Sequence, residues 1–297
     1  MARKLAITPI ILCFVLGLTF FFSKGLWAIP LMGSGSAARA GAGVAAINVH
    51  EVYTSNPSTM VGSKYYSVGG GYTSDGATLQ ASIVDTKTSE LAGAVLYHHQ
   101  TGGARYEDPN WKTNGLHVSL AGAASDQISL GITGKYIWYE QLPVGGLFTF
   151  SPLLMDQRFD LDVGGHFRVS QAVALGIVYR NMLIQKHIEV VPLPDLVVGV
   201  ALSPVSDLGV YADAGRWVKP SPVDNHWNFA MGAEYRFVAE AMLRAGYRIV
   251  TDRSDLQTLS AGIVFKWETV QLAYSAMFYV NSVPFQNTHG VSFALMF

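Results

Sequence analysis

The chain has 297 residues, of which 50% are hydrophobic and only 14% are charged, with a formal net charge of −1 at pH 7. Soluble domains carry about 25% charged residues, and a chain without excess positive charge lacks the electrostatic footprint of a nucleic-acid-binding protein. Beyond the N-terminus no run of 18 apolar residues exists, which excludes a membrane-spanning helix and leaves either an unusually apolar soluble core or a membrane β-barrel.

The first 28 residues have the features of a cleaved secretion signal. Arg3 and Lys4 supply the positive start, 5–22 is the apolar stretch, and 26–28 is a plausible cleavage site. An uncleaved anchor helix is the alternative, which the Gly/Ser/Ala-rich sequence that follows argues against. The one cysteine, Cys13, lies inside this signal, so we expect the mature chain to have no disulfide and no thiolate metal site.

Residues 29–63 are rich in glycine, alanine and serine and lack the period of a strand. Small residues suit a segment that packs tightly inside another structure, and a flexible surface leader is the alternative. The apolar stretch 44–47, followed by Val49 and Val52, is too hydrophobic for a free linker. We therefore predict that 29–63 forms a plug.

From Lys64 to the end, the sequence predicts about 14 strands. Each is about 9–13 residues long, which a tilted strand needs to cross a bilayer, whereas soluble strands average nearer five or six. The predicted strands are 64–75, 77–86, 91–99, 114–123, 127–139, 157–168, 172–182, 194–203, 207–217, 226–237, 240–250, 256–267, 269–279 and 288–297.

The connections between these strands alternate in length. Those after even-numbered strands are short, such as 87–90 and 238–239, and several after odd-numbered strands are long, such as 100–113 and 140–156. Short turns on one rim and long loops on the other are typical of outer-membrane barrels. A β-sandwich has no physical reason to sort its loops in this way. The predicted fold is therefore an all-β transmembrane antiparallel barrel over 64–297.

Alternation along the strands predicts an apolar outer face and a polar lumen. In 226–237, Trp227, Phe229 and Met231 share one face, and charged residues lie on the other. Buried charges of both signs do not fit a dry sandwich core. The predicted lumenal charges are Asp160, Asp162, Glu234, Arg236, Arg244 and Arg248. We expect the carboxylates to pair with arginines, and Asp160 and Asp162 in particular with Arg158, Arg168 or Arg236.

The last strand ends on a phenylalanine. Val291, Phe293, Leu295 and Phe297 fall on one face, as expected of a strand that meets lipid and closes against the first strand. A buried terminal strand of a soluble β-protein is the alternative. A final strand of this kind resembles the signal read by the bacterial barrel-assembly machinery, which makes that machinery an expected partner through Phe297.

The N-terminal region resembles that of FadL-type outer-membrane transporters of hydrophobic compounds. The resemblance rests on 40–46, AGAGVAA, and on Asn56-Pro57, although Ser58 stands where the family has alanine. It implies a 14-stranded barrel with its N-terminal segment as a plug in the lumen, and plug movement through Asn56 and Pro57. PorV-type barrels of a secretion system share this architecture, so a docking barrel that presents loops to a protein partner is the alternative function.

The resemblance further implies that ligand is captured by external loops and enters past the plug. Two long connections, 140–156 and 183–193, are apolar for exposed loops, which favours binding, although packing of the loops on each other as a lid is the alternative. The expected ligand-binding residues are Leu147, Phe148, Phe150, Leu153, Leu154, Leu183, Ile184 and Ile188.

The third strand is where the resemblance places a lateral opening. Residues 91–100 are apolar on both faces and contain Gly93, and an interior strand glycine indicates a bulge, a bend or a close approach. We therefore place the opening near Gly93. An ordinary strand packed on the plug is the alternative.

The sequence lacks a recognisable catalytic or cofactor-binding motif. His98 and His99 are adjacent on a strand and point to opposite faces, so they cannot bind one metal together. Asp160 and Asp162 share a face, but lumenal ion pairs explain them better than paired catalytic carboxylates. The leading hypothesis is a passive channel, not an enzyme, with no cofactor, no metal and no nucleic-acid partner, which carries a hydrophobic small molecule or lipid and is surrounded by outer-membrane lipids. A general polar porin is a third hypothesis, which the plug disfavours.

Overall fold

The computed structural model describes residues 34–47, 55–74, 77–101, 111–141, 153–183, 194–217, 227–251, 257–280 and 287–297. The predicted signal at 1–28 lies outside these ranges. Also outside them are five of the predicted ligand-binding residues, Leu147, Phe148, Phe150, Ile184 and Ile188. No helix within the described ranges is long and apolar enough to cross a membrane.

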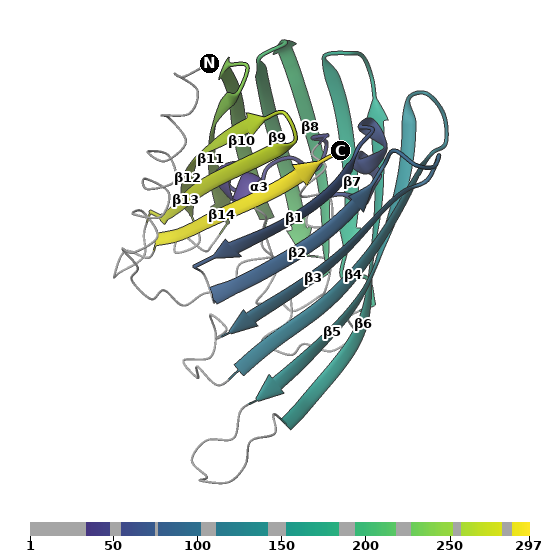
Figure 1. Cartoon of the computed structure of the whole chain (residues 1–297), viewed down its shortest axis with the longest axis vertical. Helices are drawn as coiled ribbons and strands as arrows, with labels where there is room; N and C mark the ends of the chain where they lie inside the picture. Colours follow the sequence, from purple (N-terminus) through teal and green to yellow (C-terminus); the bar gives the residue numbers. More distant parts are fainter. Residues whose placement is uncertain are drawn as a thin grey trace.

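Fourteen antiparallel strands form a closed barrel in which β1 pairs with β14, so the predicted fold is confirmed (Figure 1). Each strand overlaps its predicted range. The strands are β1 (Tyr66–Thr73), β2 (Thr78–Asp85), β3 (Ala92–Thr101), β4 (Trp111–Ala123), β5 (Ile128–Gln141), β6 (Leu153–Arg168), β7 (Val173–Arg180), β8 (Asp195–Val205), β9 (Leu208–Trp217), β10 (Trp227–Val238), β11 (Ala241–Val250), β12 (Thr258–Trp267), β13 (Val270–Tyr279) and β14 (Asn287–Met296).

Backbone pairing closes the barrel at the end of the chain. The Tyr66 amide donates to the Phe297 carbonyl (3.2 Å), and the Phe297 amide donates to the Tyr66 carbonyl (2.8 Å). Their rings lie beside each other, with centroids 6.3 Å apart. Because every strand has a partner strand on both sides, the sheet has no strand whose edge is free along its whole length.

The outer face is apolar over most of its area. Phe293 and Phe297 are 51% and 60% exposed, and Trp227, Phe229 and Met231 also project outward, as their alternation predicts. A water-soluble protein does not leave so much contiguous apolar surface exposed, whereas lipid stabilises it. Stacked aromatic pairs lie near strand ends, including Trp227 with Phe229 and Phe265 with Trp267, where interfacial aromatic girdles are expected.

Strands β4, β5 and β6 are the tallest part of the wall (Figure 1). β6 pairs with β5 along its length, but with β7 only through Val163–Arg168. A bulge in β5–β6 pairing lies between Tyr139 and Glu140. Residues 153–162 of β6 therefore extend beyond β7, and the wall is lower on the β7 side. This step in the wall lies close to the polar network that is described below.

Residues 34–47 and 55–65 lie against the inner face of the barrel. The short helix α3 (Ser34–Ala38) contacts β11 to β14, and the 3-10 turn η2 (Pro57–Gly62) contacts β3 to β6 (Figure 1). All five residues of α3 are buried. The described part of the predicted plug is therefore held between opposite sides of the wall, and the helix is too short to be stable without that packing.

Candidate functional site

Glycines on the inner wall allow the plug backbone to approach the barrel directly. A Cβ atom on Gly131 would lie 2.5 Å from the Ser58 amide nitrogen, and one on Gly176 would lie 2.4 Å from the Val44 carbonyl oxygen. A Cβ on Gly246 would lie 2.2 Å from the Arg39 carbonyl carbon. Real Cβ atoms do not approach this closely, so these positions require glycine for the plug to dock.

Asn56 joins the two plug segments and the wall. Its side-chain amide, which has two protons, lies within hydrogen-bonding distance of three carbonyls: Val44 of the plug (3.0 Å), Gly165 of β6 (3.1 Å) and Ile177 of β7 (3.3 Å). Its Oδ1 accepts from the amide and hydroxyl of Ser58, which caps the start of η2. Asn56 is fully buried, and Pro57 occupies the first position of η2.

Asp213 of β9 is a second anchor, opposite the first part of the plug. Its Oδ2 accepts hydrogen bonds from the amides of Gly43 (2.7 Å) and Val44 (3.0 Å). Gly43 has φ +131°, a left-handed conformation in which a side chain would be strained. A carboxylate aimed at two successive amides fixes the backbone path of the plug.

Arg39 is a positively charged residue of the plug that contacts side chains of the wall. Its Nη1 lies 3.4 Å from Glu234 Oε2, and its guanidinium lies 4.8 Å from the centre of the Tyr211 ring. Glu234 also pairs with Arg244 at 3.3 Å and accepts a 2.6 Å hydrogen bond from the Tyr211 hydroxyl. The prediction that Glu234 pairs with arginines is confirmed, and one of these arginines comes from the plug.

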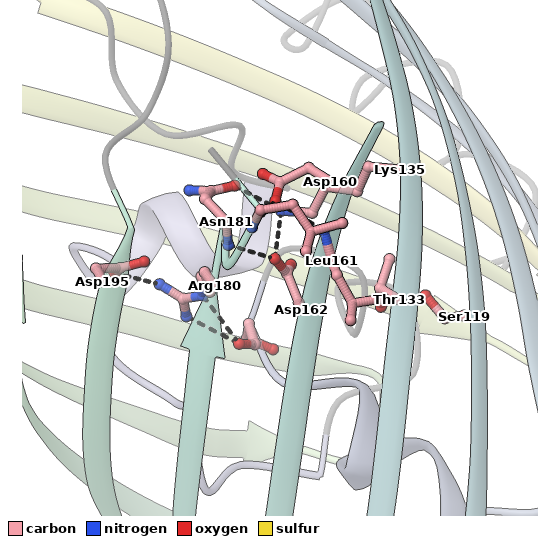
Figure 2. A network of polar contacts seen from close by, with 11 residues as sticks. Ser119, Thr133, Lys135, Asp160, Leu161, Asp162, Arg180, Asn181 and Asp195 are labelled. Carbon is pink, nitrogen blue, oxygen red and sulfur yellow. Dashed lines mark hydrogen bonds and ion pairs between the residues drawn. The ribbon is translucent and has the colours of Figure 1, made fainter. Parts of the chain in front are cut away.

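A polar network on β5 to β8 lies at the step in the wall (Figure 2). Lys135 Nζ contacts Asp162 Oδ1 at 2.6 Å and donates to Asn181 Oδ1 at 2.8 Å. The backbone amide of Asn181 donates to the same Asp162 oxygen at 2.9 Å. The expected pairing of Asp162 with Arg158, Arg168 or Arg236 is therefore wrong. The cross-strand register places Lys135 opposite Asp160, so its amine reaches the neighbouring Asp162 diagonally.

The same network reaches the plug through Arg180. Its Nη1 lies 3.3 Å from Asp195 Oδ2, and its Nη2 donates to the Ser55 carbonyl at 2.8 Å (Figure 2). Among the described residues Asp160 has no arginine partner either, and its Oδ1 accepts from the backbone amides of Leu161 (2.7 Å) and Leu183 (3.0 Å). The network thus ties the start of η2 to the step between β6 and β8.

The remaining predicted lumenal charges differ in their surroundings. Arg236 lies at the end of β10, is half-exposed and is 3.9 Å from Asp207 in the β8–β9 turn. Arg248 is only 6% exposed, and within the described residues no ion pair or hydrogen bond engages it. Of these two predicted lumenal arginines, Arg236 therefore pairs at the rim, and Arg248 is buried without a described ion pair.

The structure places the other predicted site residues apart from the plug anchors. Leu153 and Leu154 begin β6, and Leu183 follows β7 with 52% exposure. Gly93 pairs with Asp85 and Leu120 in ladders without a register shift. Of the bulge, bend or close approach that a glycine here indicates, the described ladders show no bulge, and the lateral opening stays a prediction.

Two histidines face the lumen from neighbouring strands. His98 of β3 and His117 of β4 are each 6% exposed, with ring centroids 5.1 Å apart. His99 lies on the other face, as alternation predicts, and its Nδ1 is 2.7 Å from Asn114 Oδ1. Within the described residues, no group of three or more His, Cys, Asp or Glu side chains is placed to hold a metal ion.

An apolar groove of about 780 Å³ lies over the outer face of β6 to β10. Outward-facing side chains form it, among them Phe167, Leu175, Ile177, Val198 and Phe229. Ala212 and Ala214 of β9 also line it, and its exposed side chains face the surroundings of the barrel. Its mostly apolar lining suits a hydrocarbon chain.

Comparison with solved structures finds the same fold in transporters and channels of hydrophobic compounds. The toluene transporter TbuX of Ralstonia pickettii aligns with a TM-score of 0.62 and 15% identity, over 90% of this chain and 97% of that chain. The toluene transporter TodX of Pseudomonas putida aligns at 0.64 and 12%, over 92% and 99%. A FadL homologue of Pseudomonas aeruginosa aligns at 0.57 and 13%, over 92% and 99%. No protein-family model and no curated protein matches the sequence. At this identity the likeness shows the fold, which is that of FadL-type barrels.

Sequence reasoning did not identify Arg39 and Asp213, which hold the plug, or Lys135, which pairs with Asp162 in the wall. The strand pattern places Lys135 and Asp213 on the inner face but does not reveal their partners, and Arg39 lies outside the strands. The docking glycines had a detectable signal, since Gly131, Gly176 and Gly246 all occupy inward positions of their strands. Repeated glycines on the same face of a sheet indicate that another segment packs against that face.

Proposed function

We propose that this chain is an outer-membrane channel for the passive uptake of hydrophobic small molecules, with long-chain fatty acids or similar compounds as cargo. The observation that carries the proposal is a closed barrel whose lumen is occupied by its own N-terminal segment, docked on glycines and held by Asn56 and Asp213. A segment docked in this way can block the lumen in one state and admit cargo in another.

The known proteins with this fold support the proposal at the level of chemistry. TbuX and TodX are toluene transporters, and CymD, which also aligns, is a monoaromatic hydrocarbon channel. The apolar outer face supports a location in the outer membrane, with delivery by a signal at 1–28 and assembly through the Phe297 strand. We propose capture by the external loops, passage past the plug and exit at a lateral opening near Gly93.

The plug explains why such a channel does not act as a general pore. Polar solutes and ions gain nothing from displacing it, whereas an apolar molecule that enters the lumen replaces water beside apolar side chains. In this proposal the cargo moves down its own concentration gradient.

Uptake by reconstituted protein tests the proposal. Proteoliposomes that contain the full barrel should take up a radiolabelled hydrophobic compound, such as decanoate or toluene, faster than empty liposomes do. The same vesicles should show little steady ion conductance. Uptake no faster than in empty liposomes would overturn the proposal, and co-purification of a stoichiometric protein partner together with that result would favour the docking alternative.

A further inference from the structure

The apolar groove on the outer wall has a floor of small side chains along β9. Ala212 and Ala214 project outward from this strand, and both line the groove. The strands on either side carry larger side chains at the same two levels. These flanking residues are Val198 and Val200 on β8 and Phe229 and Met231 on β10. Methyl groups between two bulkier rows leave a groove that runs along β9, with the width of one strand.

A positive charge lies at one end of this groove. Arg216 is on the same strand and the same face, two residues beyond Ala214 and therefore roughly 7 Å further along. Its side chain is exposed, and its guanidinium carbon lies 5.6 Å from the centre of the Trp227 ring, the residue that pairs with it on β10. A ring contact of this kind holds the guanidinium by its face. On the other side Arg216 pairs with Leu196 of β8, which is apolar.

The charged end of the groove is at the long-loop rim. Strand β9 ends at Trp217 and β10 begins at Trp227, with 218–226 between them, whereas only 206–207 separate β8 from β9. Long connections of outer-membrane barrels face the outside of the cell, and tryptophan is enriched at the membrane–water interface. Arg216 therefore lies at the headgroup level of the outer leaflet, and the alanine floor lies below it, in the hydrocarbon layer.

We infer that this groove and Arg216 bind one molecule of lipopolysaccharide, the phosphorylated and acylated glycolipid of the outer leaflet. One acyl chain lies along β9 over Ala212 and Ala214, and a phosphate group binds Arg216. The inference goes beyond the proposed function, because it depends on the location of the barrel in the outer membrane and not on the cargo.

The two parts of the site match the two parts of this lipid. A guanidinium presents N–H donors in a planar fork that fits phosphate oxygens, and the Trp227 ring fixes the orientation of that plane. In a bilayer the surrounding lipid is as apolar as the wall, so a chain is held by close packing contacts and not by the hydrophobic effect. A groove supplies more of these contacts than a flat wall does.

Native mass spectrometry of the full barrel in a non-ionic detergent tests the phosphate contact. The probes are diphosphoryl lipid A and the same lipid with both phosphates removed, added at equal concentrations. The wild type should retain one molecule of lipid A per barrel and prefer the phosphorylated form by about fivefold, the effect of one basic side chain at an anionic membrane surface. Arg216→Gln should abolish this preference. Arg168→Gln, the same change at an exposed position on the short-turn rim, should keep it.

A second pair of variants tests the groove. Ala214→Leu fills the floor and should lower retention of both lipid forms by about threefold or more, because the chain loses packing contacts. Ala261→Leu makes the same change on the outer face of β12, outside the groove, and should have no effect. Heat-modifiable migration on gels verifies that each variant is a folded barrel.

The lipid that remains bound after extraction from outer membranes identifies the natural occupant. The expected mass adduct is one lipopolysaccharide molecule. An adduct of phospholipid alone, or a barrel dimer without lipid, would overturn the assignment of the occupant. If Arg216→Gln matches Arg168→Gln, or if Ala214→Leu matches Ala261→Leu, the site itself is wrong. Each of these results leaves the uptake proposal standing, since the variants change neither the plug nor the lumen.

Discussion

Gly131→Ala should undock η2 from the barrel wall. The added Cβ would lie 2.5 Å from the Ser58 nitrogen and 2.6 Å from the Pro57 carbonyl carbon. Carbon atoms in favourable contact are about 3.5–4.0 Å apart, so the turn must shift by about 1 Å. The obstacles are backbone atoms, which cannot rotate away as the end of a flexible side chain can.

The expected size of the effect follows from the cost of overpacking. Inserting a methyl group into a well-packed site costs about 1–3 kcal/mol. Since about 1.4 kcal/mol corresponds to a factor of ten, the undocked population of η2 should rise by about 5-fold to 150-fold. Gly134→Ala is the matched control on the same strand, because a Cβ at that position meets nothing within 4 Å. Both substitutions change the unfolded chain equally.

The assay measures how often η2 leaves the wall. Met60 is fully buried beside Val84 and Ala92, so a cysteine at this position reacts with a maleimide only after undocking. In a Cys13→Ser, Met60→Cys background, labelling should accelerate by the same factor in Gly131→Ala and not in Gly134→Ala. Equal labelling rates in the two variants would refute the claim that η2 needs the inward-facing glycine at 131 in order to dock.

Three further substitutions probe the anchors and the wall. Asn56→Ala should raise labelling and ion conductance of the folded barrel, since it removes contacts worth about 1–3 kcal/mol; unchanged conductance would contradict a closing role. Lys135→Met should lower the free energy of unfolding in urea by about 3–5 kcal/mol because it leaves Asp162 buried without its cation, whereas Asp207→Asn, in an exposed pair, should cost less than about 1 kcal/mol. Phe297→Ala should reduce the yield of heat-modifiable barrel in outer membranes without changing expression; equal yields would remove Phe297 from the assembly signal.

The barrel was predictable because lipid and a polar lumen impose a period of two on every strand. Strand β10, for example, presents Trp227, Phe229 and Met231 outward and Asn228 and Glu234 inward, as its sequence indicates. A shift of one residue would turn all of them to the wrong face, so the pattern sets the register as well as the strand. The boundaries of the strands follow from the same pattern to within a few residues.

The partners of the lumenal charges were not predictable in the same way. Asp162 was expected to pair with an arginine on its own strand or on β10, and the partner is Lys135 on β5. Alternation says that a side chain points inward, but not which inward side chain from a distant strand or from the plug will meet it. Arg39 is the clearest case, because its contact with Glu234 depends on how α3 docks rather than on any strand pattern.

The composition of the plug is consistent with a segment that must be held and also released. Its buried residues are mostly small, such as Ala37, Ala42 and Ala45, and burying a large apolar side chain would add about 1.5–3 kcal/mol each. The plug instead relies on directional bonds from its own Asn56 to wall carbonyls and from its amides to Asp213 of the wall, which water can replace at a net cost of about 1 kcal/mol each. A plug with leucine and phenylalanine side chains would bind the wall more tightly, but its release would expose large apolar surfaces. Small residues with a few polar anchors therefore keep the lumen closed without making the closed state irreversible.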